Sequence, residues 1–274
     1  MPCPSLRRFL RRSLLSVGVI PWLAVAATAA ERGLPQITVF PAEVHKAGPQ
    51  TFDLTQDARG ILYFGNLQGL LSYDGAWWRL LKLPDEQAAL SVAADAQGRV
   101  AVGMVSDFGT LERDATGAQT FRSLLSHLPE PHRAFGDVNA ICAIRNGFLY
   151  VSERRLLVWD GRRARVAAEF AQGTAPRGCI AERGEVVLRG PHGLQRFDPI
   201  TNRITAAGLT GARVLTALRR ADGKIVAAVR GEGLFLVDGA TATPFAPDAS
   251  AWLQGKAVSG GSRLADGRLV ITTR

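Results

Sequence analysis

The sequence predicts an all-β fold built from one repeated four-stranded unit. Short apolar runs bounded by Gly and Asp recur along the chain, as expected for strands joined by tight turns. Helical periodicity is almost absent, apart from a turn expected around residues 124–128. The repeat shows most clearly in the aspartates that close each unit, which are separated by 40, 46, 38 and 40 residues: Asp74, Asp114, Asp160, Asp198 and Asp238.

The clearest copy of the unit is the stretch of residues 57–78, DARGILYFGNLQGLLSYDGAWW. Its apolar runs, Ile61–Phe64 and Leu70–Tyr73, are separated by the short link Gly65–Gly69. Asp74 and Gly75 follow the second run, and Gly readily adopts the positive φ of a tight hairpin. This copy predicts two adjacent strands of one unit.

The other strands follow from the same register. The expected first strands are Thr51–Thr55, Leu90–Ala94, Ala140–Ile144, Cys179–Ala181 and Val214–Leu218. The expected outer strands are Trp78–Leu81, Thr120–Leu124, Val166–Phe170 and Arg203–Ala206. A sixth unit begins at Asp266-Gly267 and the strand Leu269–Thr272. An insertion over 123–137 accounts for the 46-residue interval, and such insertions lie in loops on one face.

Four strands in a period of about forty residues are the signature of a β-propeller blade. Because neighbouring blades cover both faces of each sheet, the strands need no strict polar alternation. We expect a propeller over residues 30–274, with about five blades and the start of a sixth. The alternative, a two-sheet sandwich, requires five registered copies to arise by accident.

The first 29 residues resemble a secretory signal peptide. A basic region with Arg7, Arg8, Arg11 and Arg12 precedes the apolar run Leu14–Ala27 and a small-x-small site. The run is shorter than the ~18–20 residues that span a bilayer. An uncleaved membrane anchor is the alternative interpretation. Removing these four arginines lowers the formal net charge from +9 to +5, and no basic stripe points to nucleic acid.

Two cysteines remain in the exported chain, where the compartment is oxidising. Cys142 and Cys179 each lie five residues before a turn glycine, Gly147 or Gly184, which predicts equivalent strands of neighbouring units. Both a disulfide and two buried free thiols fit this placement, and the sequence favours the free thiols. No C-x-x-C pair indicates a structural zinc site.

Residues 63–75, YFGNLQGLLSYDG, resemble the two-component-regulator propeller repeat. Gly48-Pro49-Gln50, Asp107-Phe108-Gly109 and residues 124–137 add to the likeness, which extends over nearly all of the chain after residue 36. The resemblance implies the periplasmic N-terminal sensor region of a bacterial signalling protein, such as a hybrid histidine kinase or a diguanylate cyclase. It also implies a downstream β domain and a transmembrane output module in the same parent protein. We interpret this chain as an N-terminal fragment of such a protein or as a truncated gene product. The resemblance further implies seven blades when the propeller is complete, with Gln36–Phe40 expected to complete the last blade.

The sequence shows no constellation for catalysis, a metal or a cofactor, so we expect this chain to be non-catalytic. The four histidines, His45, His127, His132 and His192, are not paired at metal spacing. His127 and His132 are interpreted as solvated surface residues. The closing aspartates are expected to accept backbone hydrogen bonds in their hairpins instead of forming a carboxylate array. Trp77 and Trp78 offer a stacking surface for sugars, but packing of one of them between blades is favoured.

If a ligand binds, we expect it on the face with the turns between second and third strands, near the central channel. Polar residues expected to be exposed there suit a small polar or oligosaccharide-like ligand: Asn66, Gln68, Ser106, Asp107, Arg154, His192, Arg230 and Glu232. The leading hypothesis is an extracytoplasmic ligand-sensing module of a transmembrane signalling protein. The rivals are a secreted propeller enzyme, such as a lactonase, polysaccharide lyase or quinone-dependent dehydrogenase, and an envelope interaction scaffold.

Overall fold

A computed structural model describes residues 37–274 of the protein. The predicted signal segment and Gln36 lie outside the described residues. Phe40–Arg274 forms one compact unit. Within residues 37–274, every helix is too short or too polar to span a bilayer.

The unit consists of five four-stranded antiparallel sheets and one two-stranded hairpin, which we number as blades 1–6. Blade 1 is β1 (Thr51–Gln56), β2 (Leu62–Asn66), β3 (Gly69–Tyr73) and β4 (Trp78–Leu81). Blade 2 is β5 (Ser91–Ala94), β6 (Val100–Gly103), β7 (Phe108–Arg113) and β8 (Gln119–Ser123). Blade 3 is β9 (Val138–Ile144), β10 (Gly147–Ser152), β11 (Arg155–Trp159) and β12 (Ala164–Glu169).

The remaining blades repeat the pattern. Blade 4 is β13 (Gly178–Glu182), β14 (Glu185–Gly190), β15 (Gly193–Phe197) and β16 (Ile204–Ala206). Blade 5 is β17 (Val214–Arg219), β18 (Ile225–Val229), β19 (Gly233–Asp238) and β20 (Thr241–Pro244). Blade 6 is the pair β21 (Val258–Arg263) and β22 (Leu269–Thr273). The helices are α1 (Ala42–His45), α2 (Pro247–Leu253) and three 3-10 turns, Pro84–Glu86, Leu125–His127 and Glu130–His132.

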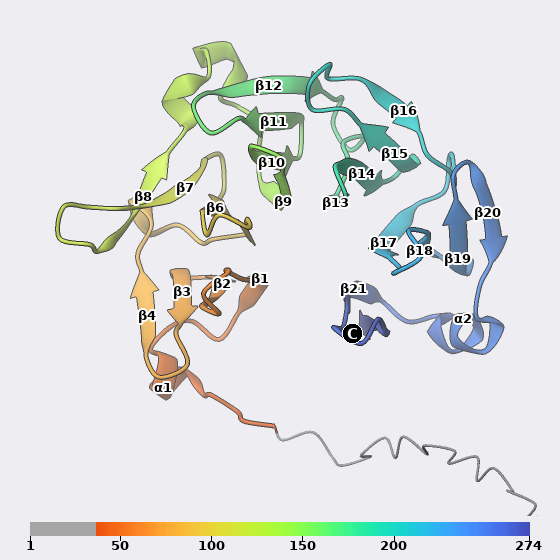
Figure 1. Ribbon diagram of the computed structural model, residues 1–274, viewed down its shortest axis with the longest axis horizontal. Coiled ribbons are helices and arrows are strands. Elements are labelled where there is room, and N and C mark those ends of the chain that lie inside the picture. The colour runs from red at the N-terminus through yellow and green to blue at the C-terminus, as the bar shows by residue number, and fades with distance from the viewer. Residues whose placement is uncertain (1–36) are drawn as a thin grey trace, which may run out of the picture. The chain divides into compact units, whose positions relative to one another are not determined.

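In every blade the strands pair in chain order, so each turn joins neighbours in the sheet. Figure 1 shows the blades following one another around a centre, with β1, β9, β13, β17 and β21 innermost and β4, β12, β16 and β20 at the outer rim. Inner strands of successive blades contact one another, as β1 with β5 and β9 with β13. The predicted propeller is therefore confirmed, while the count of seven blades stays a prediction.

Apolar side chains between neighbouring blades form the core, as the repeat requires. Between blades 1 and 2 the cluster includes Tyr63, Leu70 and Met104, all almost fully buried. Four further clusters lie at the following blade junctions. Each sheet is thus covered on both faces by its neighbours, which explains why its strands read as continuous apolar runs.

The insertion over 123–137 contributes to this core. Leu124, Leu128 and Phe135 are buried together with Phe108 and Tyr150 between blades 2 and 3. The ring centroids of Phe108 and Phe135 are 5.6 Å apart, edge to face. The predicted turn around residues 124–128 is confirmed as a 3-10 turn. This insertion is therefore a packed part of the propeller.

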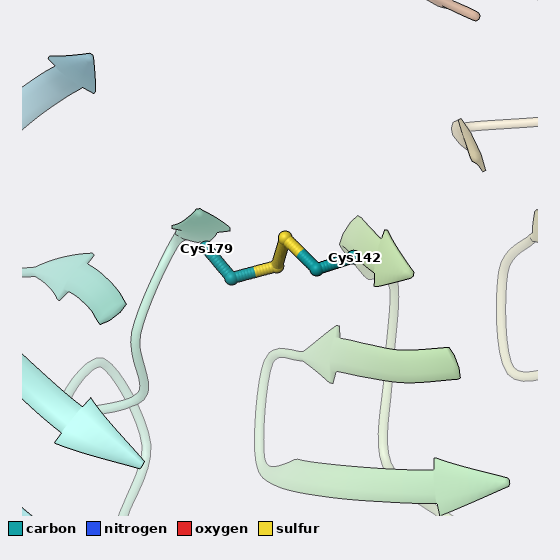
Figure 2. The surroundings of a disulfide bond; sticks show 2 residues. All are labelled: Cys142 and Cys179. Atoms are coloured by element: carbon teal, nitrogen blue, oxygen red, sulfur yellow. A yellow bond between two sulfur atoms is a disulfide. The ribbon is translucent and has the colours of Figure 1, made fainter. Parts of the chain in front are cut away.

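The prediction of two buried free thiols is wrong. Cys142 on β9 and Cys179 on β13 form a disulfide, with their Cα atoms 6.1 Å apart (Figure 2). Both residues are half-buried. The sequence placed them correctly on equivalent strands, and these are the inner strands of adjacent blades, which lie close enough for a disulfide.

The expectation that Gln36–Phe40 completes the last blade is also wrong for residues 37–40, the part of this segment that the structure describes. Residues 37–40 form no strand. The ring of Phe40 packs against blade 1 instead, with its centroid 5.4 Å from that of Tyr73 and 5.2 Å from that of Trp78. These contacts hold the segment before α1 at blade 1, although Phe40 remains 38% exposed.

Candidate functional site

Turns between second and third strands place the predicted site residues at one end of the blades. The strand order is the same in each blade, so these turns lie on one face, which we call the entry face because each inner strand also begins there. On the entry face, six of the eight predicted ligand-binding residues are exposed: Gln68, Ser106, Arg154, His192, Arg230 and Glu232.

Asn66 is buried, so its expected exposure is wrong. Its side-chain amide donates hydrogen bonds to the carbonyl oxygens of Gly48 (2.7 Å) and Gln50 (3.0 Å). Its Oδ1 atom accepts one from the N–H of Gln68 at 3.0 Å. The side chain ties the segment before β1 to the β2–β3 turn, and these bonds give it a structural role.

Asp107 is half-buried and also uses its carboxylate internally. Its Oδ1 accepts hydrogen bonds from Ser123 Oγ and from the N–H of Phe108, each at 2.7 Å. Burial raises the pKa of Asp107 above its ordinary value, against the lowering effect of these bonds. The carboxylate therefore fixes the β6–β7 turn to the end of β8.

Asp137 is a carboxylate of the entry face that sequence reasoning missed. Burial, followed by the nearby Glu153 carboxylate, raises the pKa of Asp137. The backbone N–H of Glu153 donates to the Asp137 carbonyl oxygen at 3.1 Å, which holds the two residues together. The only sequence signal was the position of Asp137 at the end of the insertion.

The two histidines of the insertion are half-buried and contact blade 3, so the prediction of solvated side chains is wrong for His127 and holds only in part for His132, whose side chain is 39% exposed. His127 Nδ1 accepts a hydrogen bond from the N–H of Ala164 at 3.1 Å. His132 Nδ1 lies 2.8 Å from Glu169 Oε1, and Arg155 Nε donates to the same carboxylate at 3.1 Å. The side chains anchor the insertion to blade 3, the blade that follows it in the chain. In the described part of the chain, no three His, Cys, Asp or Glu residues are grouped to hold a metal.

The opposite face carries the hairpin aspartates. As predicted, Asp74, Asp114, Asp160 and Asp198 each accept hydrogen bonds from backbone N–H groups two to four residues further along. Asp238 differs, because its carboxylate pairs with Lys224 Nζ at 2.9 Å. Asp238 is the last residue of β19, and only Gly239 and Ala240 separate it from β20, which begins at Thr241, so its carboxylate reaches the neighbouring β17–β18 hairpin instead.

A cavity of about 460 Å³ opens at the entry face between blades 5 and 6. Its walls are the end of β18, the turn after it, and the link from α2 to β21, residues 253–258. Arg230, one of the predicted site residues, lines it together with Lys256, which sequence reasoning missed. Lys256 lies outside the repeat pattern, and its only signal was a cation in the link between two blades.

Helix α2 positions the far wall of this cavity. Ser250 Oγ donates to the Phe245 carbonyl oxygen at 2.8 Å and accepts from the N–H of Leu234 at 2.9 Å. A Cβ at Gly233, where φ is +93°, would lie 2.8 Å from Ser250 Cβ, so glycine allows the helix to approach β19 closely. Lys256 Nζ lies 4.4 Å from the ring centroid of the exposed Trp252, which restricts the ammonium group near the cavity mouth.

Comparison with known proteins shows the fold. No protein-family model matches the chain, and no curated protein matches it by sequence. Among solved structures, 81% of this chain is similar to 77% of virginiamycin B lyase from Staphylococcus aureus, with a TM-score of 0.60 and 12% identity. A WD40 β-propeller domain of Doa1 is similar over 81% of this chain and 75% of that chain, with a TM-score of 0.58 and 11% identity. The chain is a β-propeller.

A further likeness is to the extracellular domain of a hybrid two-component system of Bacteroides thetaiotaomicron. It covers 86% of this chain and 34% of that chain, with a TM-score of 0.60 and 16% identity. At such identities these comparisons show the propeller fold alone.

Proposed function

We propose that the protein is an extracytoplasmic ligand-sensing propeller of a bacterial transmembrane signalling protein. The observation that carries the proposal is the likeness of 86% of the chain to the extracellular domain of a hybrid two-component system. The Cys142–Cys179 disulfide supports export, because disulfides persist in oxidising compartments. The basic-then-apolar pattern of residues 1–29 agrees with this location.

In this function the propeller binds a ligand without converting it and passes on occupancy through its contacts with the next domain. A rigid scaffold suits the task, because residues on loops are held in place by the packed blades. The polar entry face offers the recognition surface. The parent protein's downstream β domain and its transmembrane output module are part of this proposal.

A secreted lyase is the second candidate, favoured by the likeness to virginiamycin B lyase and to a streptogramin B lyase at 12% identity. One experiment separates the two. The exported chain is screened by thermal shift against saccharides and organic acids, and each stabilising compound is then incubated with it and examined by mass spectrometry. If the protein is a sensor, the compound raises the melting temperature of the protein and is recovered unchanged. Conversion of many molecules of the compound per protein molecule would establish an enzyme.

Export is tested separately by thiol trapping in whole cells. In a periplasmic fraction, Cys142 and Cys179 should resist alkylation until a reductant is added. Immediate alkylation of both cysteines in protein recovered from the cytoplasm alone would contradict the proposed location.

A further inference from the structure

The cavity between blades 5 and 6 has a positive lining without a compensating acid. Arg230 and Lys256 are its charged residues, and no Asp or Glu is among the twelve residues that line it. Within residues 37–274, the Arg230 guanidinium makes no hydrogen bond or ion pair, and Lys256 has only the ring of Trp252. Glu232 belongs to the same turn as Arg230 but does not line the cavity.

A third cation reaches the neighbouring strand. Arg189 lies at the end of β14, and its Nη1 donates to the carbonyl oxygen of Leu215 on β17 at 2.6 Å. Leu215 itself lines the cavity. A Cβ at Gly178 would come within 2.7 Å of the Arg189 guanidinium, so the glycine leaves room for this side chain to cross from blade 4 to blade 5. Burial lowers the pKa of Arg189, and in the described chain no carboxylate lies close enough to offset it.

Two more arginines extend the positive region along the entry face. Arg177 and Arg213 directly precede the inner strands β13 and β17, and both are free of side-chain hydrogen bonds and ion pairs within residues 37–274. By contrast, many arginines at the opposite face pair with turn carboxylates, as Arg59 does with Asp57 and Arg99 with Asp95. Uncompensated cations in one region attract anions and favour their binding.

The remaining walls determine what kind of anion fits. Leu215, Val229, Leu253 and Val258 give the cavity an apolar side. The backbone N–H groups of Gly231 and Gly255, which also line it, have no acceptor in the described part of the chain. A volume of about 460 Å³ holds a molecule of one or two rings, within the usual range for small-molecule sites.

We propose that this cavity binds a small organic anion, a molecule with a carboxylate or sulfate ester on an apolar or sugar-like body. Arg230 and Lys256 hold the anionic group, and the apolar side receives the body of the molecule. The assignment names the ligand class of the proposed sensor and rests on that function for its biological meaning. The binding itself is a property of the cavity alone.

Calorimetric titration of the exported chain tests the assignment with two probe pairs matched except for charge. Glucuronate is compared with glucose, and benzoate with benzyl alcohol, so that the two pairs distinguish a sugar acid from an aromatic acid. We expect at least one acid to bind at millimolar concentration or below, with its neutral partner at least about tenfold weaker. Arg230→Gln and Lys256→Gln should each weaken that binding about tenfold.

Arg162→Gln is the matched control, since Arg162 is also exposed but lies in the β11–β12 turn of the opposite face. It should leave the affinity unchanged, and unaltered melting temperatures should show that all three variants fold. Equal binding of acid and neutral partner, binding indifferent to Arg230 and Lys256, or no binding of either acid would overturn the assignment. If an acid binds in this way but does not alter signalling by the parent protein, the cavity assignment stands and the sensor function fails.

Discussion

At the scale of single residues, Asp57 shows how a turn carboxylate stabilises a blade. Its side chain is fully buried and accepts hydrogen bonds from the N–H groups of Arg59 (2.9 Å) and Ile61 (3.0 Å). Arg59 Nη2 also donates to it at 2.8 Å. Burial alone would raise the pKa of Asp57, but these bonds, first those from Arg59, lower it below its ordinary value of 3.8. Asp95 and Arg99 repeat the arrangement in blade 2.

We predict that Asp57→Ala lowers the free energy of unfolding by about 2 kcal/mol at neutral pH. Because the folded pKa is depressed, this stabilisation is complete above the unfolded pKa and is lost as the pH falls below about 4 through the folded pKa. Denaturant titrations should therefore show a smaller difference in the free energy of unfolding between wild type and variant at pH 3 than at pH 7. Asp222→Ala, at an exposed turn of blade 5, is the control and should cost less than about 0.5 kcal/mol.

The adjacent tryptophans provide a second test with an internal control. Trp78 is half-buried, stacked on Tyr73 with ring centroids 4.5 Å apart and lying 5.6 Å from Phe64, whereas Trp77 is 70% exposed. Packing of one tryptophan between blades was predicted, but the aromatic partners of Trp78 belong to its own blade, to Phe40 and to His45 of α1 instead of the next blade. We expect Trp78→Ala to cost about 2–3 kcal/mol and Trp77→Ala less than about 0.5 kcal/mol in chemical unfolding. Equal costs would contradict the packing described for blade 1.

At the scale of elements, the disulfide joins the inner strands of blades 3 and 4 across a sequence separation of 37 residues. A covalent link over a loop of this length restricts the unfolded chain, and the chain-entropy model gives about 3–4 kcal/mol of stabilisation. We predict a loss of this size in the variant Cys142→Ala/Cys179→Ala. Unfolding of wild type with and without reductant provides the comparison: reductant should destabilise wild type and leave the variant unaffected.

Repetition made the elements predictable from sequence. One well-preserved copy around Tyr63 set the register, and every expected strand within the repeat lies within two residues of an observed one, as for Trp78–Leu81. The expected strand Gln36–Phe40 lies outside the repeat, and it is the one that does not form over residues 37–40. Pairings between units were harder to predict. The spacing of Cys142 and Cys179 gave equivalent strands but not the short distance between them, which depends on how closely adjacent inner strands approach. His127 and His132 appeared polar and solvated because the sequence does not show that Ala164 and Glu169 lie opposite them.

At the scale of the whole molecule, the sequence predicted which face carries the polar turns, but not which of those residues are free to bind. The side chains of Asn66 and Asp107 form hydrogen bonds within the fold, whereas Arg230 lines a cavity. The cavity also depends on Lys256 and on the close approach of α2 to β19. Both α2 and the link that carries Lys256 lie outside the repeat. Such a site arises between units, so the pattern within one unit does not reveal it.

We propose that the propeller recognises its ligand at the entry face between blades 5 and 6. Hydrogen–deuterium exchange of the exported chain, with and without whichever probe acid binds, tests this most directly. We predict increased protection in residues 229–233 and 253–258, and none in the opposite-face turns at 74–76 and 160–163. Protection confined to those opposite-face turns, or to blades 1 and 2, would contradict the account.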